Sequence, residues 1–241
     1  MKLLKMLAIA SFLFLTFTAC LYAEGEALAI KALTGRVLIK PAGAAEWSEA
    51  TAGQIVNEKD SLKTEADSNV LLEFSDKSTV ALRPGTEITI EDLKLGEAAS
   101  KVNINMPIGD LRAILQKMSP DSEFNVKTPM AISGARGTTF YVNATPTSTS
   151  VYVTDGAINF YDSVTGETYT ITVGMIMTVN ADGTIDGPRP ATEAEKQAAI
   201  TTWDVGVLAE PYTEAPPSEN TPEPPDVTPE NTGDDSKAST T

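Results

Sequence analysis

Polar and apolar residues alternate with a period of two along most of this chain, and turn residues interrupt the alternation about every ten residues. Runs of this kind lie at residues 33–39, 69–74, 78–82, 87–91 and 102–108. Because successive side chains of a β-strand point to opposite faces, such runs are typical of strands with one buried face. Short strands at this interval predict an all-β fold, namely a single antiparallel β-sandwich or β-roll domain.

One segment is compatible with two structures. Between residues 108 and 118 the apolar side chains fall both at helical spacing and at alternate positions. Pro107 and Gly109 do not help a helix to start, and the family resemblance described below favours a strand, which we predict here.

Four glycines form a weak internal repeat. The interval from Gly35 to Gly53 is the same as that from Gly156 to Gly174, and each glycine begins a short apolar run. The repeat suggests that two parts of the sheet use a similar strand–turn–strand unit. It does not repeat a third time, so a solenoid is not predicted.

The stretch at residues 124–142 contains the most specific pattern in the chain. Thr128-Pro129 predicts a kink, and Gly134 and Gly137 predict a compact turn between two strands. Arg136 lies alone between these glycines. We interpret it as an arginine that pins the turn by hydrogen bonds to carbonyls or a carboxylate. The alternative, an anion- or ligand-binding arginine, lacks a second basic residue in the turn.

This stretch, with Val-x-Thr-Pro at 126–129 and Gly-Ala-Arg-Gly-Thr at 134–138, resembles the signature of the FecR domain family. Similar features at 35–39, 68–78 and 151–158 extend the resemblance to about residues 30–187. The resemblance implies that the motif residues are structural or face a ligand; they are Thr128, Pro129, Gly134, Arg136, Gly137, Thr138 and Phe140.

FecR proteins proper relay a signal from an outer-membrane receptor to a cytoplasmic sigma factor, and they carry a cytoplasmic segment and a transmembrane helix before the exported domain. This sequence begins differently, with Lys2, Lys5 and an apolar run at 7–17 that is typical of a signal peptide. We therefore expect no cytoplasmic segment, and the resemblance does not extend to direct regulation of a sigma factor.

The expected organisation has four parts. Residues 1–23 are predicted as a signal peptide, 24–190 as the FecR-like β domain, 191–210 as a short helix and linker, and 211–241 as a disordered acidic tail rich in Pro, Thr and Glu. Thr192 and Glu195 have capping-box spacing, and Trp203 is expected to dock the helix on the β domain.

Two processing routes are open for the leader. Cleavage after Ala23 gives a soluble protein, whereas the partial lipobox at 17–20 would place an acylated Cys20 at the new N-terminus. We favour soluble export, to the periplasm or outer envelope. The membrane is then reached only through the possible lipid anchor at Cys20.

The composition excludes several kinds of chemistry. The chain has no histidine, which removes Ser–His–Asp triads and histidine metal sites. A net charge of −15 disfavours a nucleic-acid partner. We do not attribute the acidic residues to a paired-carboxylate hydrolase, because we place them on solvated sheet faces and in turns: Glu73, Asp76, Glu87, Glu91, Asp155 and Asp162. We interpret residues 180–186 as a hairpin turn and not as a calcium loop.

We therefore predict a protein that is not an enzyme and has no cofactor or metal. The favoured hypothesis is an exported FecR-like module that binds or senses in the bacterial cell envelope. It would pair β-strands with an envelope protein or receptor, and signal relay is one role open to it. The alternative is a structural envelope protein that binds cell-wall glycan or polysaccharide.

Overall fold

The computed structural model describes residues 28–96, 98–200 and 203. The predicted signal peptide, Cys20 and the predicted tail at 211–241 lie outside the described residues. The strands are β1 (Leu28–Thr34), β2 (Val37–Lys40), β3 (Ser48–Glu49), β4 (Ile55–Val56), β5 (Ser61–Thr64), β6 (Asn69–Phe74), β7 (Thr79–Leu82), β8 (Glu87–Lys94), β9 (Lys101–Ile114), β10 (Glu123–Lys127), β11 (Ala131–Ala135), β12 (Thr139–Thr145), β13 (Ser148–Asp155), β14 (Ala157–Asp162), β15 (Thr168–Thr172), β16 (Met175–Asn180) and β17 (Ile185–Pro190), and helix α2 spans Glu193–Ile200.

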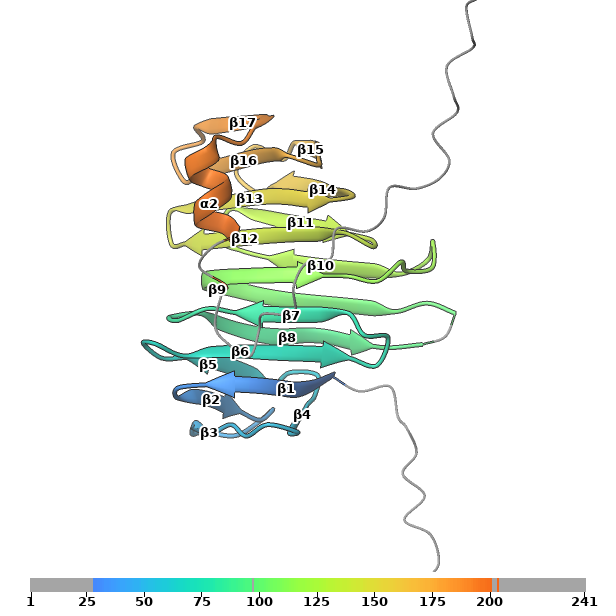
Figure 1. Ribbon diagram of the computed structural model, residues 1–241, viewed down its shortest axis with the longest axis vertical. Coiled ribbons are helices and arrows are strands. Elements are labelled where there is room, and N and C mark those ends of the chain that lie inside the picture. Colours follow the sequence, from blue (N-terminus) through green and yellow to red (C-terminus); the bar gives the residue numbers. More distant parts are fainter. Residues whose placement is uncertain (1–27, 97, 201–202, 204–241) are drawn as a thin grey trace, which may run out of the picture. The chain divides into compact units, whose positions relative to one another are not determined.

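These strands form two sheets that share β9, which confirms the predicted all-β fold. Sheet A has the order β4-β1-β6-β7-β9-β12-β13-β16-β17. Sheet B has the order β3-β2-β5-β8-β9-β10-β11-β14-β15. Figure 1 shows the strands stacked broadly in chain order, with β2, β3 and β4 at one end and β17 at the other. One detail differs from the predicted antiparallel domain, because β9 and β10 pair in parallel.

Strand β9 connects the two sheets. Its first part pairs with β8 and β10 in sheet B, and its last six residues pair with β7 and β12 in sheet A. The chain crosses at Gly109, where φ is +119° and an added Cβ would lie 2.4 Å from the Cα of Thr86. Only glycine fits so close a crossing. The segment that sequence patterns left open is therefore a strand, as predicted.

The core lies between the inner faces of the two sheets. Alternate residues of the strands are buried there, as in the burial pattern of β10, where Phe124 and Val126 are inside and Asn125 is not. Phe124 contacts Phe74 and Phe140 in edge-to-face geometry, with ring centroids 6.1 and 6.3 Å apart. Burial of these apolar side chains is the main driving force that holds the sheets together.

The four glycines of the internal repeat lie at equivalent positions of the fold. Gly35 and Gly156 follow sheet A strands and precede sheet B strands, whereas Gly53 and Gly174 lead back from sheet B to sheet A. All four have positive φ, between 68° and 82°. The repeated spacing in the sequence therefore corresponds to a repeated pair of sheet-to-sheet turns.

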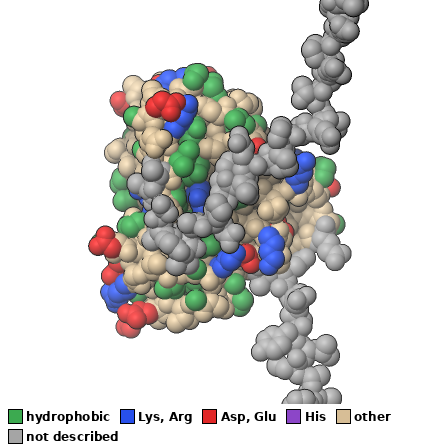
Figure 2. All heavy atoms as spheres, viewed as in Figure 1, with side chains coloured by type: hydrophobic (Ala, Val, Ile, Leu, Met, Phe, Trp, Pro, Cys, Tyr) green, Lys and Arg blue, Asp and Glu red, His purple; other side chains and the backbone are tan. Residues whose placement is uncertain are grey.

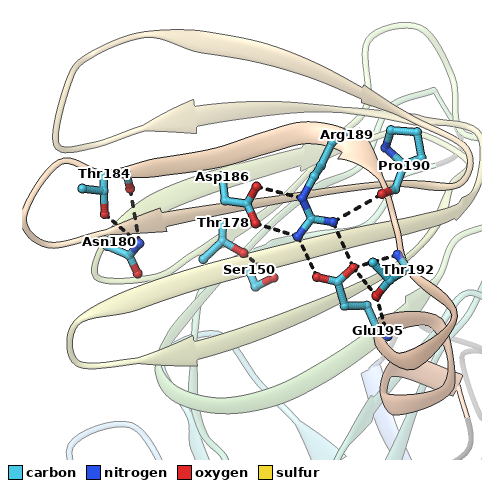
Figure 3. A network of polar contacts seen from close by, with 9 residues as sticks. All are labelled: Ser150, Thr178, Asn180, Thr184, Asp186, Arg189, Pro190, Thr192 and Glu195. Atoms are coloured by element: carbon cyan, nitrogen blue, oxygen red, sulfur yellow. Dashed lines mark hydrogen bonds and ion pairs between the residues drawn. The ribbon is translucent and has the colours of Figure 1, made fainter.

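Helix α2 begins with the predicted capping box. The backbone N–H of Thr192 donates to Glu195 Oε2 at 2.7 Å, and the N–H of Glu195 donates to Thr192 Oγ1 at 3.3 Å. Arg189 on β17 binds the same Glu195 and also Asp186, at 2.7 and 2.6 Å from its Nη2 (Figure 3). The helix start is thus tied to strand β17 by one guanidinium group.

Trp203 is 3% exposed and packs on the outer face of sheet A, as expected. Its ring lies 5.4 and 5.5 Å from the guanidinium carbons of Arg83 and Arg112, and its centroid is 5.9 Å from that of Tyr141. Cation–π contacts of this kind favour a desolvated tryptophan ring.

Most of the six carboxylates expected on solvated surfaces are exposed or half-buried, and Figure 2 shows acidic and basic side chains interspersed on the visible face. Asp162 is a correction, because it is fully buried. Its carboxylate accepts hydrogen bonds from the backbone of Val164 at 2.7 Å and the hydroxyl of Thr165 at 2.7 Å. It therefore holds the β14–β15 turn.

Residues 180–186 form the predicted hairpin turn between β16 and β17. Gly183 has a φ of 80°, and Asp182 Oδ1 accepts a hydrogen bond from the backbone N–H of Thr184 at 2.9 Å. In the part of the chain that the structure describes, no helix is long and apolar enough to span a membrane.

Candidate functional site on the outer face of sheet B

The signature stretch at 124–142 spans β10, β11 and β12, and its inward residues belong to the core. Phe124 and Phe140 are at most 2% exposed. The Thr128-Pro129 kink is a tight turn, in which Thr128 Oγ1 lies 2.9 Å from the carbonyl oxygen of Ala131 and 2.8 Å from the hydroxyl oxygen of Thr149. These motif residues therefore serve the fold.

The turn between β11 and β12 is held by Thr138. Its fully buried Oγ1 lies 3.0 Å from the carbonyl oxygen of Ala157 and 3.2 Å from that of Arg136. Gly137 has a φ of +60°, and an added Cβ would lie 3.1 Å from the Cα of Lys117. The positive φ and the close approach to Lys117 require a glycine at 137, and the buried hydrogen bonds of the turn require the hydroxyl of Thr138.

Arg136 does not make the contacts that we predicted. Its side chain is exposed, and within the described residues its guanidinium has no hydrogen bond or ion pair with a carbonyl or carboxylate. Thr138 takes the pinning role, because a hydroxyl on a short side chain reaches the turn carbonyls from inside the fold. Arg136 instead lines a hollow on the outer face of sheet B.

A row of polar residues crosses this outer face. By strand register Asp92 lies beside Asn103, Asn103 beside Asn125, Asn125 beside Gly134, and Gly134 beside Asn159. Each of the three asparagines lies between two inward-pointing apolar residues of its strand. The row is therefore produced by ordinary strand alternation.

Hydrogen bonds orient the first amides of this row. Asn103 Nδ2 donates to Asp92 Oδ2 at 2.5 Å, and Asn125 Nδ2 donates to Asn103 Oδ1 at 2.9 Å. An ionised carboxylate only accepts, so Asp92 fixes which end of the Asn103 amide faces it, and Asn103 in turn fixes Asn125. The carbonyl oxygen of Asn125 consequently faces Gly134, where an added Cβ would lie 3.0 Å from it.

The hollow has a volume of about 550 Å³ and lies open on the sheet. Its lining includes two amides, one guanidinium, one carboxylate and one phenol, from Asn125, Asn159, Arg136, Glu123 and Tyr161. Gly134 leaves it free of a side chain at its centre.

The electrostatics of the site are mild. The hydrogen bond from Asn103 lowers the pKa of Asp92, with smaller contributions from nearby lysines, so this carboxylate stays ionised at neutral pH. Arg136 and Glu123 bring opposite charges to the rim. No group of three or more acidic or cysteine side chains within the described residues is arranged to hold a metal ion.

Sequence reasoning included Gly134 and Arg136 among the site residues but missed Asn103, Asn125 and Asn159. A signal was present, because each of these asparagines separates two apolar residues of a strand, and asparagine is depleted in strands. The pairing of the strands, which brings the three amides into one row, was not visible in the sequence.

The fold is a double-sheet, all-β domain with a polar hollow on the outer face of sheet B. Residues 60–159 of the chain match the family model FecR, described as FecR protein. This match is narrower than the resemblance at 30–187, and it includes β5 to β13 and the first residues of β14. A comparison with curated proteins finds no match.

The solved structures similar to this chain include two from Parabacteroides distasonis. Each is a crystal structure of a protein provisionally described as an anti-sigma factor. The first has 16% identity and a TM-score of 0.48, and the alignment covers 60% of this chain and 65% of that one. The second has 17% identity and a TM-score of 0.44, with 52% and 57% covered. The chain thus spans less than two thirds of either protein.

Proposed function

We propose that this chain is an exported, non-enzymatic binding module of the bacterial cell envelope that recruits a partner protein by strand addition, within a signal relay. The FecR domain supports the relay, and the absence of histidine from the sequence supports a role without acid–base or nucleophilic catalysis of the triad type.

The observation that carries this proposal is the unequal protection of the sheet edges. Among the described strands the edges are β3 and β4, each of two residues, and β15 and β17. Strand β17 carries Pro188 and Pro190 together with the charges of Asp186 and Arg189. Proline and charge are common protection against edge pairing, and very short strands offer few backbone groups.

Strand β15 has none of these protections. Its five residues, Thr-Tyr-Thr-Ile-Thr, include no charge and no proline, and within the described residues it pairs only with β14. Figure 1 shows it beside β14 near the end of the stack that also holds β17. β-branched and aromatic residues favour strand pairing, so its free side is a template for another strand.

Exposed apolar side chains lie near this edge. Tyr161, Val164 and Val173 are 41%, 42% and 56% exposed, and they lie on β14, in the β14–β15 turn and just after β15. A partner strand that pairs with β15 would cover part of this apolar surface. We therefore assign an extended segment of an envelope protein or receptor as the partner.

The proposal is tested by placing a photo-crosslinking amino acid at Thr170 of the full chain in cells of its own host. Thr170 is an exposed residue at the middle of β15. We expect a cross-linked product with one envelope protein, and none when the same amino acid replaces Thr147, which is exposed in the β12–β13 turn.

Thr170→Lys should reduce capture of this partner at least tenfold, because a lysine on an edge strand opposes pairing. Thr147→Lys adds the same charge away from the edge and should leave capture unchanged. Equal cross-linking from both positions, or undiminished capture by Thr170→Lys, would contradict strand addition at β15.

A further inference from the structure

Gly134 is a glycine that the backbone does not require. It lies within β11, which pairs with β10 on one side and β14 on the other, and its φ is not positive. A glycine inside a strand weakens it and often marks a place where a ligand approaches closely. What Gly134 provides here is space, because it leaves the centre of the hollow unfilled.

The groups around this space have free hydrogen-bonding capacity. The carbonyl oxygen of Asn125 faces the hollow and accepts no hydrogen bond within the described residues. Its orientation is fixed by the hydrogen bonds that run from Asp92 through Asn103 to Asn125. Asn159 lies across Gly134, is exposed, and its amide makes no hydrogen bond within the described residues. The hollow therefore presents one fixed acceptor and one amide that can both donate and accept.

The chemistry of the lining narrows the class of ligand. Both sides of β11 are used in sheet pairing, so the floor of the hollow has no strand edge to offer an extended peptide. An anion would meet Arg136 but also Glu123, on a chain with a net charge of −15. Side-chain amides suit hydroxyl groups, which likewise donate and accept.

The ring of Tyr161 adds a flat apolar surface. It is 41% exposed and lines the hollow together with Ile132. An aromatic ring of this kind combines a large apolar face with a polar tip. Hydroxyl groups on one side and a compact apolar face on the other are the features of a sugar ring.

We propose that the hollow at Gly134 binds one unit of a neutral saccharide. A hydroxyl of the sugar donates to Asn125 Oδ1, Asn159 exchanges hydrogen bonds with a second hydroxyl, and the sugar's apolar face lies against Tyr161. The hollow lies on the outer face of the sheet and takes a sugar, whereas strand addition uses the free backbone edge of β15; the two adjoin at Tyr161 and Thr168.

The test is titration of the full chain with chitotetraose and with cellotetraose, monitored by NMR of side-chain amide signals. We expect either sugar to shift the Asn125 and Asn159 amide signals in a saturable manner. Tetragalacturonate and a five-residue Thr-Tyr-Thr-Ile-Thr peptide serve as anionic and peptide probes. The proposal would be overturned if only the anionic or the peptide probe shifted these amide signals, or if none of the four probes shifted them.

Variants separate this site from the rest of the molecule. Gly134→Ala, which places a Cβ at 3.0 Å from Asn125 Oδ1, should weaken saccharide binding at least tenfold. Asn159→Ala should do the same, and it removes an exposed side chain with no hydrogen bond to lose within the described residues. The matched control is Asn105→Ala, which removes an outward amide of β9 outside the hollow and should leave binding unchanged.

Gly134→Ala distinguishes the two proposals, because β11 is separated from β15 by β14. It should weaken saccharide binding and leave capture of the strand-addition partner unchanged. Saccharide binding that survives both Gly134→Ala and Asn159→Ala would place the sugar elsewhere and overturn the assignment of this hollow.

Discussion

The inner faces of the two sheets are both apolar, but their outer faces differ in the side chains that they carry and in what covers them. On sheet A, Trp203 covers Leu71 and Ala81, which are 7% and 1% exposed, and Tyr141 stacks on Tyr152 with ring centroids 6.1 Å apart. Helix α2 is tied to this side by Arg189 (Figure 3). The outer face of sheet A is therefore a second, small apolar layer.

On sheet B, the outward positions next to the hollow carry amides, hydroxyls and one glycine. Asn125 and Asn159 occupy the same places in their strands that Tyr141 and Tyr152 occupy in sheet A, each between two buried apolar residues. The difference teaches that the outward residue of an alternating strand reports what lies over it. At these four positions tyrosine lies on a covered face and asparagine on an open one, whereas Tyr161 on the open face is itself 41% exposed.

The largest effect that tests this comparison is expected from Trp203→Ala. Removal of a buried aromatic ring from a packed site costs about 3 kcal/mol in the free energy of unfolding, measured by denaturant titration. Trp47→Ala is the control, because Trp47 is only half-buried and its ring contacts Lys40 Nζ at 5.1 Å. An equal loss in both variants would show that the face of sheet A is not a covered layer.

A smaller loss is expected from Arg112→Ala. Arg112 is half-buried against the ring of Trp203, so truncation removes both a cation–π contact and the packing of its aliphatic stem. We expect about 1–2 kcal/mol less free energy of unfolding. In a Trp203→Ala background the same substitution should cost clearly less, because the two side chains stabilise each other; purely additive losses would contradict this contact.

The attachment of α2 should also depend on pH, by a smaller amount. The ion pair with Arg189, followed by hydrogen bonds from Thr192, lowers the pKa of Glu195 from 4.5 to about 2. A carboxylate with a depressed folded-state pKa stabilises the fold above its unfolded pKa, and that stability is lost as the pH falls toward the folded value.

The measurement compares the free energy of unfolding of the native chain with that of Glu195→Gln across pH. Their difference should be constant above pH about 4.5 and should close as the pH approaches 2. Glu73, whose pKa is lowered by Lys31 and Lys77, affects both proteins and cancels in the difference. Asp186 shares Arg189 with Glu195, so the double variant Asp186→Asn/Glu195→Gln against Asp186→Asn repeats the comparison without its contribution. A difference that does not change with pH would exclude Glu195 as the titrating contact.

Much of this fold was visible in the sequence, because alternation, turn glycines and the capping box each act locally. Alternation predicted the strand at 102–108, and the family resemblance favoured a strand in the segment from Ile108 to Met118; the structure has one strand from Lys101 to Ile114. The parallel pair of β9 and β10 was not predictable, because it depends on which distant strands meet. Asp162 was misjudged for a related reason, since burial of a carboxylate depends on the turn that surrounds it.

The candidate site shows the same division. Gly134 and Arg136 were found because the glycines stand out in one stretch of sequence. The amides beside them come from β9, β10 and β14, and only strand register brings these three into a row. A sequence can therefore indicate that a residue faces outward. Its neighbour on the adjacent strand can be identified only once the pairing of the strands is known.

The smallest effect is expected from Arg136→Ala. From the sequence alone, an arginine that pins a buried turn predicts a loss of about 1–3 kcal/mol. In the structure the side chain is exposed and Thr138 holds the turn, so we expect a change within about 0.5 kcal/mol. Arg112→Ala is its counterpart on the covered face, with the same atoms removed. Denaturant titration of the two variants tests this contrast. If both lost the same large amount of unfolding free energy, the exposure of Arg136 and the burial of Arg112 would not account for their contributions, and the difference between the two faces would not hold here.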